Sequence, residues 1–203
     1  MTYHHGNLRS ALLDRAATVI AEEGIEALSL RALARDLGVS HAAPGRHFKD
    51  RADLLAALAA EGHRRMTAAL NAAVAAAGDD PVARYNALGR EVVAFSMRHP
   101  AYFQVTQHPE VERHSDPSLM AARQAFGDTV RAAAAAAQAA GWRPDEDLEA
   151  LQLFSTAAAL GAASVLMRQS KFAGRPTVEL LAIAGRVIDL VIPPSLEALR
   201  QES

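Results

Sequence analysis

Apolar residues recur at steps of three and four along the start of the chain, which is the spacing of an amphipathic helix. One stripe consists of Leu8, Leu12, Ala16, Val19 and Ile20. Gly24 follows this stripe and suits the left-handed position that ends many helices. Ser29 and Gly38 bound a second, shorter stripe, with serine as a good N-cap and glycine as a stop. The pattern predicts two short helices joined by a tight connection.

The rest of the chain has the same helical periodicity, and Pro and Gly separate the periodic segments. Asp50 is placed to cap a long helix that runs toward Gly78. Further helices are predicted over residues 82–98, 100–107, 117–140, 144–170 and 177–192, with a loop at 107–117. Because strand-like alternation is almost absent, we expect an all-α fold.

Composition excludes several classes of protein. Half of the 203 residues are hydrophobic, which is enough for a buried core, and there is no cysteine for a disulfide framework, a thiolate zinc site or a nucleophile. No run approaches the roughly 18 apolar residues of a membrane span, and the N-terminus lacks the features of a secretory signal. We therefore expect a cytoplasmic protein with no membrane partner.

Positive charge gathers near the start of the chain. The net charge is −2, yet residues 28–65 hold seven Lys and Arg against four Asp and Glu. The same region contains a helix-turn-helix spacing, with Ala34 small where two helices would cross, Gly38 in the turn and Val39 between the helices. An ordinary helix ended by a glycine would have the same pattern, so this alternative stays open.

Gly78-Asp79-Asp80-Pro81 is the clearest break in the middle of the chain, because Pro81 suits the first turn of a new helix. We expect an N-terminal three-helix helix-turn-helix head at residues 1–50 and a connecting helix at 51–80. A larger helical bundle should occupy residues 81–203.

Two stretches carry a resemblance to a known family, Ser29-Leu30-Arg31-Ala32-Leu33-Ala34 and the segment from His47 to Leu55. With the apolar first helix they resemble the TetR family of bacterial transcriptional repressors over residues 8–58. Residues 3–9, 41–44 and 99–103 are more loosely similar to the subgroup whose C-terminal region is called the WHG domain. Of that subgroup's Trp-x-x-x-His-Gly-like pattern only Gly161 remains, since Thr156 and Leu160 occupy the other positions.

The chain departs from the family at Gly45, where a tyrosine is usual. Pro44 and Gly45 both disfavour an α-helix, so the residues alone predict a distorted turn over 41–47. The resemblance instead implies a short recognition helix at this place.

The resemblance implies a DNA-binding surface in the head, with double-stranded DNA as partner. The positions implied for contact are Ser29, Ser40, His41, Ala42, Gly45, Arg46, His47, Lys49 and Arg51. The first residues of the implied recognition helix, Ser40 to Ala42, would face base edges, and the cations that follow them would lie along phosphates. The alternatives are a solvated charged surface and, for Ser29, a helix cap alone.

The larger C-terminal region is implied to bind a small hydrophobic effector. Its candidate pocket residues are Phe95, Met97, Tyr102, Phe103, Met120, Phe126, Phe154 and Met167, although core packing is the alternative for each. Two faces of small and aliphatic residues predict a homodimer through a four-helix bundle. The residues expected at that interface are Ala158, Gly161, Ala162, Val165, Leu181, Gly185 and Ile188, and the alternative is packing within the monomer.

Metal and enzyme chemistry have weaker support. His4 and His5 are adjacent, and His108, Glu110, Glu112 and His114 alternate in a predicted loop, but such residues more often face water, so we predict no metal and no cofactor. The sequence has no nucleophile–base set and no Gly-rich phosphate loop. The resemblance implies a homodimeric repressor that binds a pseudo-palindromic operator and is released by a hydrophobic effector. The alternative is a helical-bundle sensor, carrier or enzyme that does not bind DNA.

Overall fold

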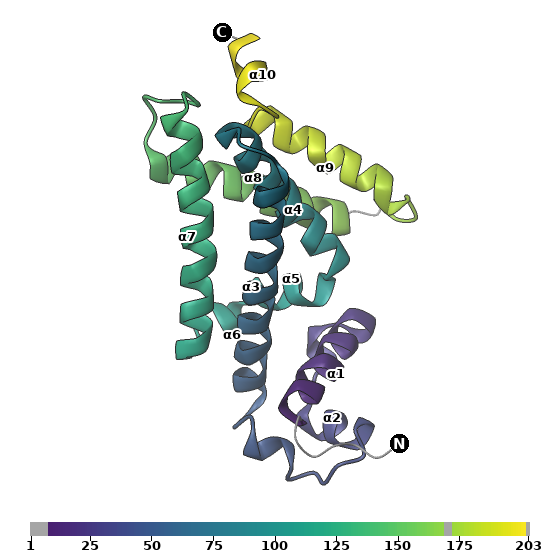
Figure 1. The fold of residues 1–203 in the computed structure, drawn as a ribbon. Coiled ribbons are helices and arrows are strands. Elements are labelled where there is room, and N and C mark those ends of the chain that lie inside the picture. Colours follow the sequence, from purple (N-terminus) through teal and green to yellow (C-terminus); the bar gives the residue numbers. More distant parts are fainter. Residues whose placement is uncertain (1–7, 169–171, 202–203) are drawn as a thin grey trace. The chain divides into compact units, whose positions relative to one another are not determined.

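A computed structural model describes residues 8–168 and 172–201, so His4 and His5 lie outside the described residues. The described chain is all-α and contains no strand, which confirms the predicted fold class (Figure 1). The N-terminal elements are α1 (Leu8–Glu23), η2 (Ile25–Ala27), α2 (Leu30–Asp36), η3 (Pro44–Arg46) and α3 (Arg51–Ala76). The elements that follow are α4 (Pro81–Arg98), α5 (Pro100–Thr106), α6 (Pro109–Glu112), α7 (Pro117–Ala139), α8 (Leu148–Arg168), α9 (Thr177–Val191) and α10 (Leu196–Gln201).

Most residues predicted to cap or end a helix lie at a helix end in the structure. Gly24 has φ 89° directly after α1, although its ψ of 166° is extended rather than left-handed helical. Gly38 has φ 66° after α2. Asp50 caps α3, since its Oδ1 accepts a hydrogen bond from the backbone N–H of Asp53 at 2.8 Å. Ser29 occupies the N-cap position of α2, but its side chain makes no cap hydrogen bond.

Three local features differ from the sequence prediction. The segment 107–117, predicted as a loop, contains the single turn α6. Helix α8 begins at Leu148 instead of residue 144, because the Asp147 carboxylate accepts a hydrogen bond from the N–H of Ala150 at 2.8 Å. Helix α10 was not predicted, and its Leu196 N–H donates to the Asp80 carboxylate at 2.7 Å.

The first of two compact units comprises the described residues up to Arg64 together with His99–Arg123. It contains α1, α2, the beginning of α3, α5 and α6, and α5 packs against α1 and η2. Leu12, Leu33, Leu54 and Phe48 are buried and form its core. The segment after α4 thus belongs to the same unit as the predicted helix-turn-helix head.

The second unit comprises Arg65–Arg98 and the residues from Gln124 onward. Within it α4, α8 and α9 pack against one another in all three pairings. Tyr85 and Trp142, both buried, meet edge to face with ring centroids 5.4 Å apart. Helix α8 is apolar enough by length and composition to cross a membrane, with a mean hydropathy of 1.6, although 28% of that window is buried in the structure.

Candidate functional site

The segment after α2 is a chain of tight turns. The N–H of Ala43 donates to the Ser40 carbonyl at 2.9 Å, and the N–H of His47 donates to the Pro44 carbonyl at 2.9 Å. Pro44–Arg46 forms the 3-10 helix η3, and no α-helix is present between α2 and α3. The turn predicted from Pro44 and Gly45 is therefore present, and the short recognition helix implied by the resemblance is reduced to the single 3-10 turn η3.

Residues 40–49, which we call the recognition segment, present an exposed polar surface. Eight of the nine predicted DNA-contact residues are exposed, namely Ser29, Ser40, His41, Ala42, Gly45, Arg46, His47 and Lys49. Pro44 and Phe48 are buried and anchor the segment to its unit. The guanidinium of Arg9 lies 5.4 Å from the centre of the Phe48 ring, a cation–π contact that was not predicted. This arrangement holds the backbone while its polar side chains face solvent.

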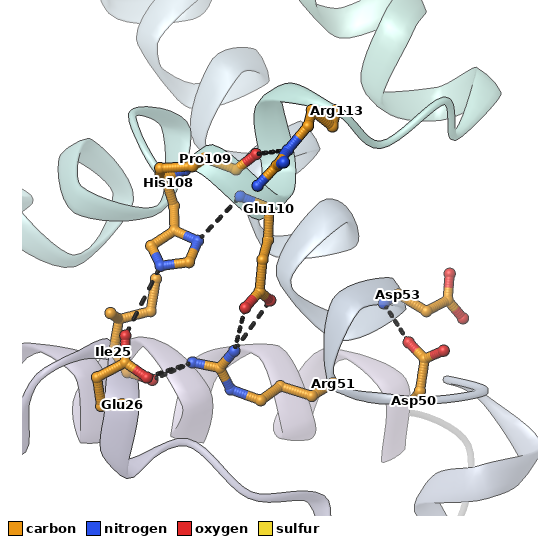
Figure 2. A network of polar contacts seen from close by, with 9 residues as sticks. All are labelled: Ile25, Glu26, Asp50, Arg51, Asp53, His108, Pro109, Glu110 and Arg113. Carbon is orange, nitrogen blue, oxygen red and sulfur yellow. Dashed lines mark hydrogen bonds and ion pairs between the residues drawn. The ribbon is translucent and has the colours of Figure 1, made fainter.

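Arg51, the ninth residue, has a different environment (Figure 2). Its Nη1 donates to both carboxylate oxygens of Glu110, at 3.0 and 3.2 Å. Its Nη2 donates to the carbonyl of Ile25 at 2.9 Å and to the Glu26 carboxylate at 3.4 Å. The side chain is 28% exposed. The structure therefore corrects the expectation that Arg51 is a cation available to phosphate, because its guanidinium joins η2, α3 and α6 within the first unit.

His108 completes this Arg51 network. Its Nδ1 accepts a hydrogen bond from the N–H of Glu110 at 3.4 Å, and its Nε2 lies 3.8 Å from the Glu26 carboxylate (Figure 2). His108 and Glu110 thus take part in contacts between helices, and among the described residues no group of three or more His, Asp and Glu is arranged to hold a metal ion. The contact between Arg51 and Glu110 spans 59 residues of sequence, so no local pattern indicated it.

The second unit contains a small cavity among α4, α7 and α8, which we call the α4–α8 cavity. Its lining residues are Tyr85, Leu88, Gly89, Val92, Phe126, Val130, Ser155, Thr156, Ala159, Leu160 and Ile192. The free volume is about 20 Å³, which is room for one water molecule. The hydroxyl groups of Tyr85 and Ser155, which both line the cavity, are hydrogen-bonded to each other. Burial raises the pKa of Tyr85 above its ordinary value.

The large apolar residues expected to share one pocket are dispersed. Phe126 lines the α4–α8 cavity, whereas Met97 and Met167 line a different one, of about 280 Å³, near the end of α8. Phe95, Tyr102 and Phe103 are buried, the last two in the first unit.

Met120 is 57% exposed and Phe154 is 52% exposed. Phe154 directly precedes the cavity residue Ser155 on α8, and neighbouring helical residues point about 100° apart. The prediction that these eight residues line one cavity is therefore wrong, because residue size alone does not tell which helix face carries them.

The predicted dimer residues divide into an outer and an inner set. On α8, Gly161 has open space around it and Val165 is 41% exposed. Ala158, Ala162 and, on α9, Leu181 are half-buried.

Gly185 and Ile188 on α9 belong to the inner set, which corrects their assignment to an interface between subunits. A Cβ at Gly185 would collide with the guanidinium of Arg90 in the same chain. Ile188 lies against Gly89, 3.0 Å from the position of an added Cβ. Arg90 is fixed by the Asp189 carboxylate at 2.6 Å, so these residues hold α9 against α4.

Comparison with known proteins covers both halves of the chain. Residues 12–58 match the bacterial regulatory proteins of the tetR family, and residues 85–190 match the tetracyclin repressor-like C-terminal domain. No curated protein matches the sequence significantly. A protein of unknown function from Rhodococcus sp. RHA1 is 34% identical with a TM-score of 0.76, over 95% of this chain and 98% of that one.

Two more distant structures share the fold. The TetR family regulator PfmR from Thermus thermophilus is 20% identical, with a TM-score of 0.69 over 89% of this chain and 96% of that one. The regulator FadR from Bacillus subtilis, solved in complex with stearoyl-CoA, is 15% identical, with a TM-score of 0.71 over 92% and 98%. At these identities the likeness concerns the fold alone, and the WHG subgroup stays a prediction. Because the C-terminal match spans more than half of the chain and the N-terminal match covers the head, the protein belongs to the TetR family of bacterial regulatory proteins.

Proposed function

We propose that the protein is a homodimeric transcriptional repressor that binds a pseudo-palindromic operator and leaves it when a small hydrophobic effector occupies the α4–α8 cavity. A DNA-binding transcriptional regulator, and not an enzyme, follows from the family and its structural relatives. The repressor role, the dimer, the effector and a cytoplasmic location are the proposal.

The proposed DNA-binding surface is supported chiefly by the exposed recognition segment, which the buried residues Pro44 and Phe48 anchor to the first unit. Its cations Arg46 and Lys49 have the exposure that phosphate contact requires, and His41 can donate to a base edge. Arg31, exposed in the first turn of α2, adds a cation that the sequence prediction did not include. Arg51 supports this surface through its network and makes no phosphate contact in the proposal.

The dimer is supported by apolar side chains on α8 and α9 that their own chain leaves in solvent. These are Leu153 at 70% exposure, Phe154 at 52%, Val165 at 41%, Val178 at 72% and Leu190 at 86%. Helices α8 and α9 pack against each other, and a contiguous exposed apolar patch usually marks a contact with another molecule. A second copy of the chain, related by a two-fold axis, would cover both helices and place two heads on one operator.

A single substitution tests both the dimer interface and its role in DNA binding. Leu190→Glu places a charge in the proposed interface, so sedimentation at micromolar concentration should show monomers, and affinity for the operator should fall because one head contacts one half-site. Arg131→Glu, on the exposed side of α7, is the matched control and should remain dimeric. A dimeric Leu190→Glu protein would contradict the interface, and a monomer with full affinity would contradict the link to DNA binding.

A further inference from the structure

The α4–α8 cavity is mainly apolar, and its polar side-chain atoms are all hydroxyl groups. Among the described residues that line it, Tyr85, Ser155 and Thr156 carry polar side-chain atoms, and none of the eleven is charged. The other lining residues are aliphatic, aromatic or glycine. Among the lining side chains, a polar or charged group of a bound molecule can therefore pair only with neutral hydroxyl groups.

The positions of the protons at the Tyr85–Ser155 pair follow from the neighbouring acceptors. Ser155 Oγ lies 2.7 Å from the carbonyl of Leu151, one turn earlier on α8, and a carbonyl can only accept. The single Ser155 proton is used in that bond, so the Tyr85 hydroxyl donates to Ser155 Oγ. Tyr85 therefore supplies one movable proton at the cavity wall and retains lone pairs that can accept.

The uncharged lining of the α4–α8 cavity disfavours ionised ligands. Burial raises the pKa of Tyr85, so its hydroxyl stays protonated at neutral pH. A carboxylate or phosphate group in the cavity would lose its water and find no cation among the described lining residues. A carbonyl or hydroxyl group loses much less hydration and can be satisfied by Tyr85 alone.

We propose that the α4–α8 cavity takes a small, neutral, mainly apolar molecule with one carbonyl or hydroxyl oxygen, which bonds to Tyr85 in place of Ser155. This inference rests on the effector role proposed above and specifies the ligand class. Because the cavity now has room for about one water molecule, the ligand must move side chains apart as it enters. The exchange also breaks the hydroxyl bond between α4 and α8, which gives the ligand a direct effect on the packing of these helices.

A second hollow is the main rival location for such a ligand. A groove of about 510 Å³ runs beside α7 and is lined by Val74, Arg84, Asp128 and three alanines that include Ala133. The groove contains the Asp128 carboxylate as well as Arg84, and Arg84 already donates to the Asp79 carboxylate at 2.9 Å, so its charges are balanced within the protein. The two hollows therefore differ in that charged side chains line the groove but not the α4–α8 cavity.

The test uses three six-carbon ring compounds at pH 7.5, namely cyclohexanone, cyclohexanol and cyclohexanecarboxylate. Binding is measured by ligand-observed NMR titration and by the shift of the thermal midpoint. We expect the ketone and the alcohol to bind at least about fivefold more tightly than the carboxylate, and Tyr85→Phe to remove most of that preference. Tyr102→Phe, the same change at a buried tyrosine of the first unit, is the matched control and should bind like the wild type.

Each other result overturns the proposal. Preference for the carboxylate, no binding of either neutral compound, or unchanged binding by Tyr85→Phe would each exclude the neutral-oxygen site. Loss of binding in Ala133→Leu with retention in Tyr85→Phe would assign the ligand to the groove on α7 instead. Titration of the operator without any ring compound separately tests the repressor function, so a failure of either proposal is distinguishable from a failure of the other.

Discussion

Replacing Arg51 with alanine should weaken the folded first unit but leave its salt-dependent attraction to DNA unchanged. The guanidinium is 28% exposed and donates to Glu110 and to the Ile25 carbonyl, so it is occupied inside the protein. Lys49, two residues earlier, is exposed on the recognition segment. The two cations should therefore give opposite results when each is replaced by alanine.

The magnitude follows from the individual contacts. The bond from charged Arg51 to the Ile25 carbonyl contributes about 1.5 kcal/mol. The pair with Glu110, whose side chain is 46% exposed, contributes about 0.5 kcal/mol after solvent screening, and the Glu26 contact adds little because Glu26 is 84% exposed. Arg51→Ala should thus lower the free energy of unfolding by about 2 kcal/mol. Glu110→Gln keeps an acceptor and should lower it by about 0.5 kcal/mol.

Urea unfolding followed by circular dichroism measures the stability. The single tryptophan, Trp142, lies in the second unit, so its fluorescence is the wrong probe for this change. Operator affinity is measured by fluorescence anisotropy between about 50 and 200 mM salt, a range over which phosphate contacts change affinity strongly. Lys49→Ala should flatten the slope of log affinity against log salt by roughly one unit with stability unchanged.

An equal flattening of the salt slope by Arg51→Ala and by Lys49→Ala would exclude a purely structural role for Arg51. That result would mean that Arg51 leaves its network and neutralises a phosphate. Unchanged stability in Arg51→Ala would likewise show that the contacts in Figure 2 contribute nothing to folding.

Three further predictions concern stability and are checked by urea or thermal unfolding. Gly185→Leu should destabilise the second unit by about 1–3 kcal/mol, because the new side chain displaces Arg90, and wild-type stability would contradict the packing described for α9. Arg143→Gly should stabilise by about 1 kcal/mol, since Arg143 has φ 47°, and no gain would mean that its backbone carries no strain. Burial, with a smaller contribution from Arg123, lowers the pKa of His63 from 6.5 to about 4. Folding therefore favours the neutral imidazole of His63. The free energy of unfolding is unaffected by this group above about pH 6.5 and decreases as the pH drops toward 4, by about 2 kcal/mol at pH 5. His63→Gln should remove that part of the pH dependence.

Local chemistry allowed much of the fold to be predicted from the sequence. Pro81 and Asp50 begin α4 and α3 where expected, because proline and a capping carboxylate act on the adjacent backbone. Pro44 and Gly45 likewise predicted the turn that the structure contains. These signals depend on neighbours within one helical turn.

The candidate site was harder to predict because its contacts are distant in sequence. Nothing near Arg51 indicates Glu110, and nothing near Gly185 indicates that Arg90 covers it. Helical spacing shows that a face is apolar but not whether its own chain or a second copy covers it. The Tyr85–Ser155 pair joins residues 70 positions apart, and neither residue is among the large apolar residues predicted for the pocket.

Specific operator binding is measured by titrating the wild-type protein into fluorescent duplexes of about 40 base pairs that tile the intergenic DNA upstream of its own gene. One fragment should bind two protomers saturably, at least about a thousandfold more tightly than the rest, and its log affinity should fall linearly with log salt. Equal, weak binding to every fragment would contradict the proposed repressor function and would leave a helical sensor that does not bind a specific operator.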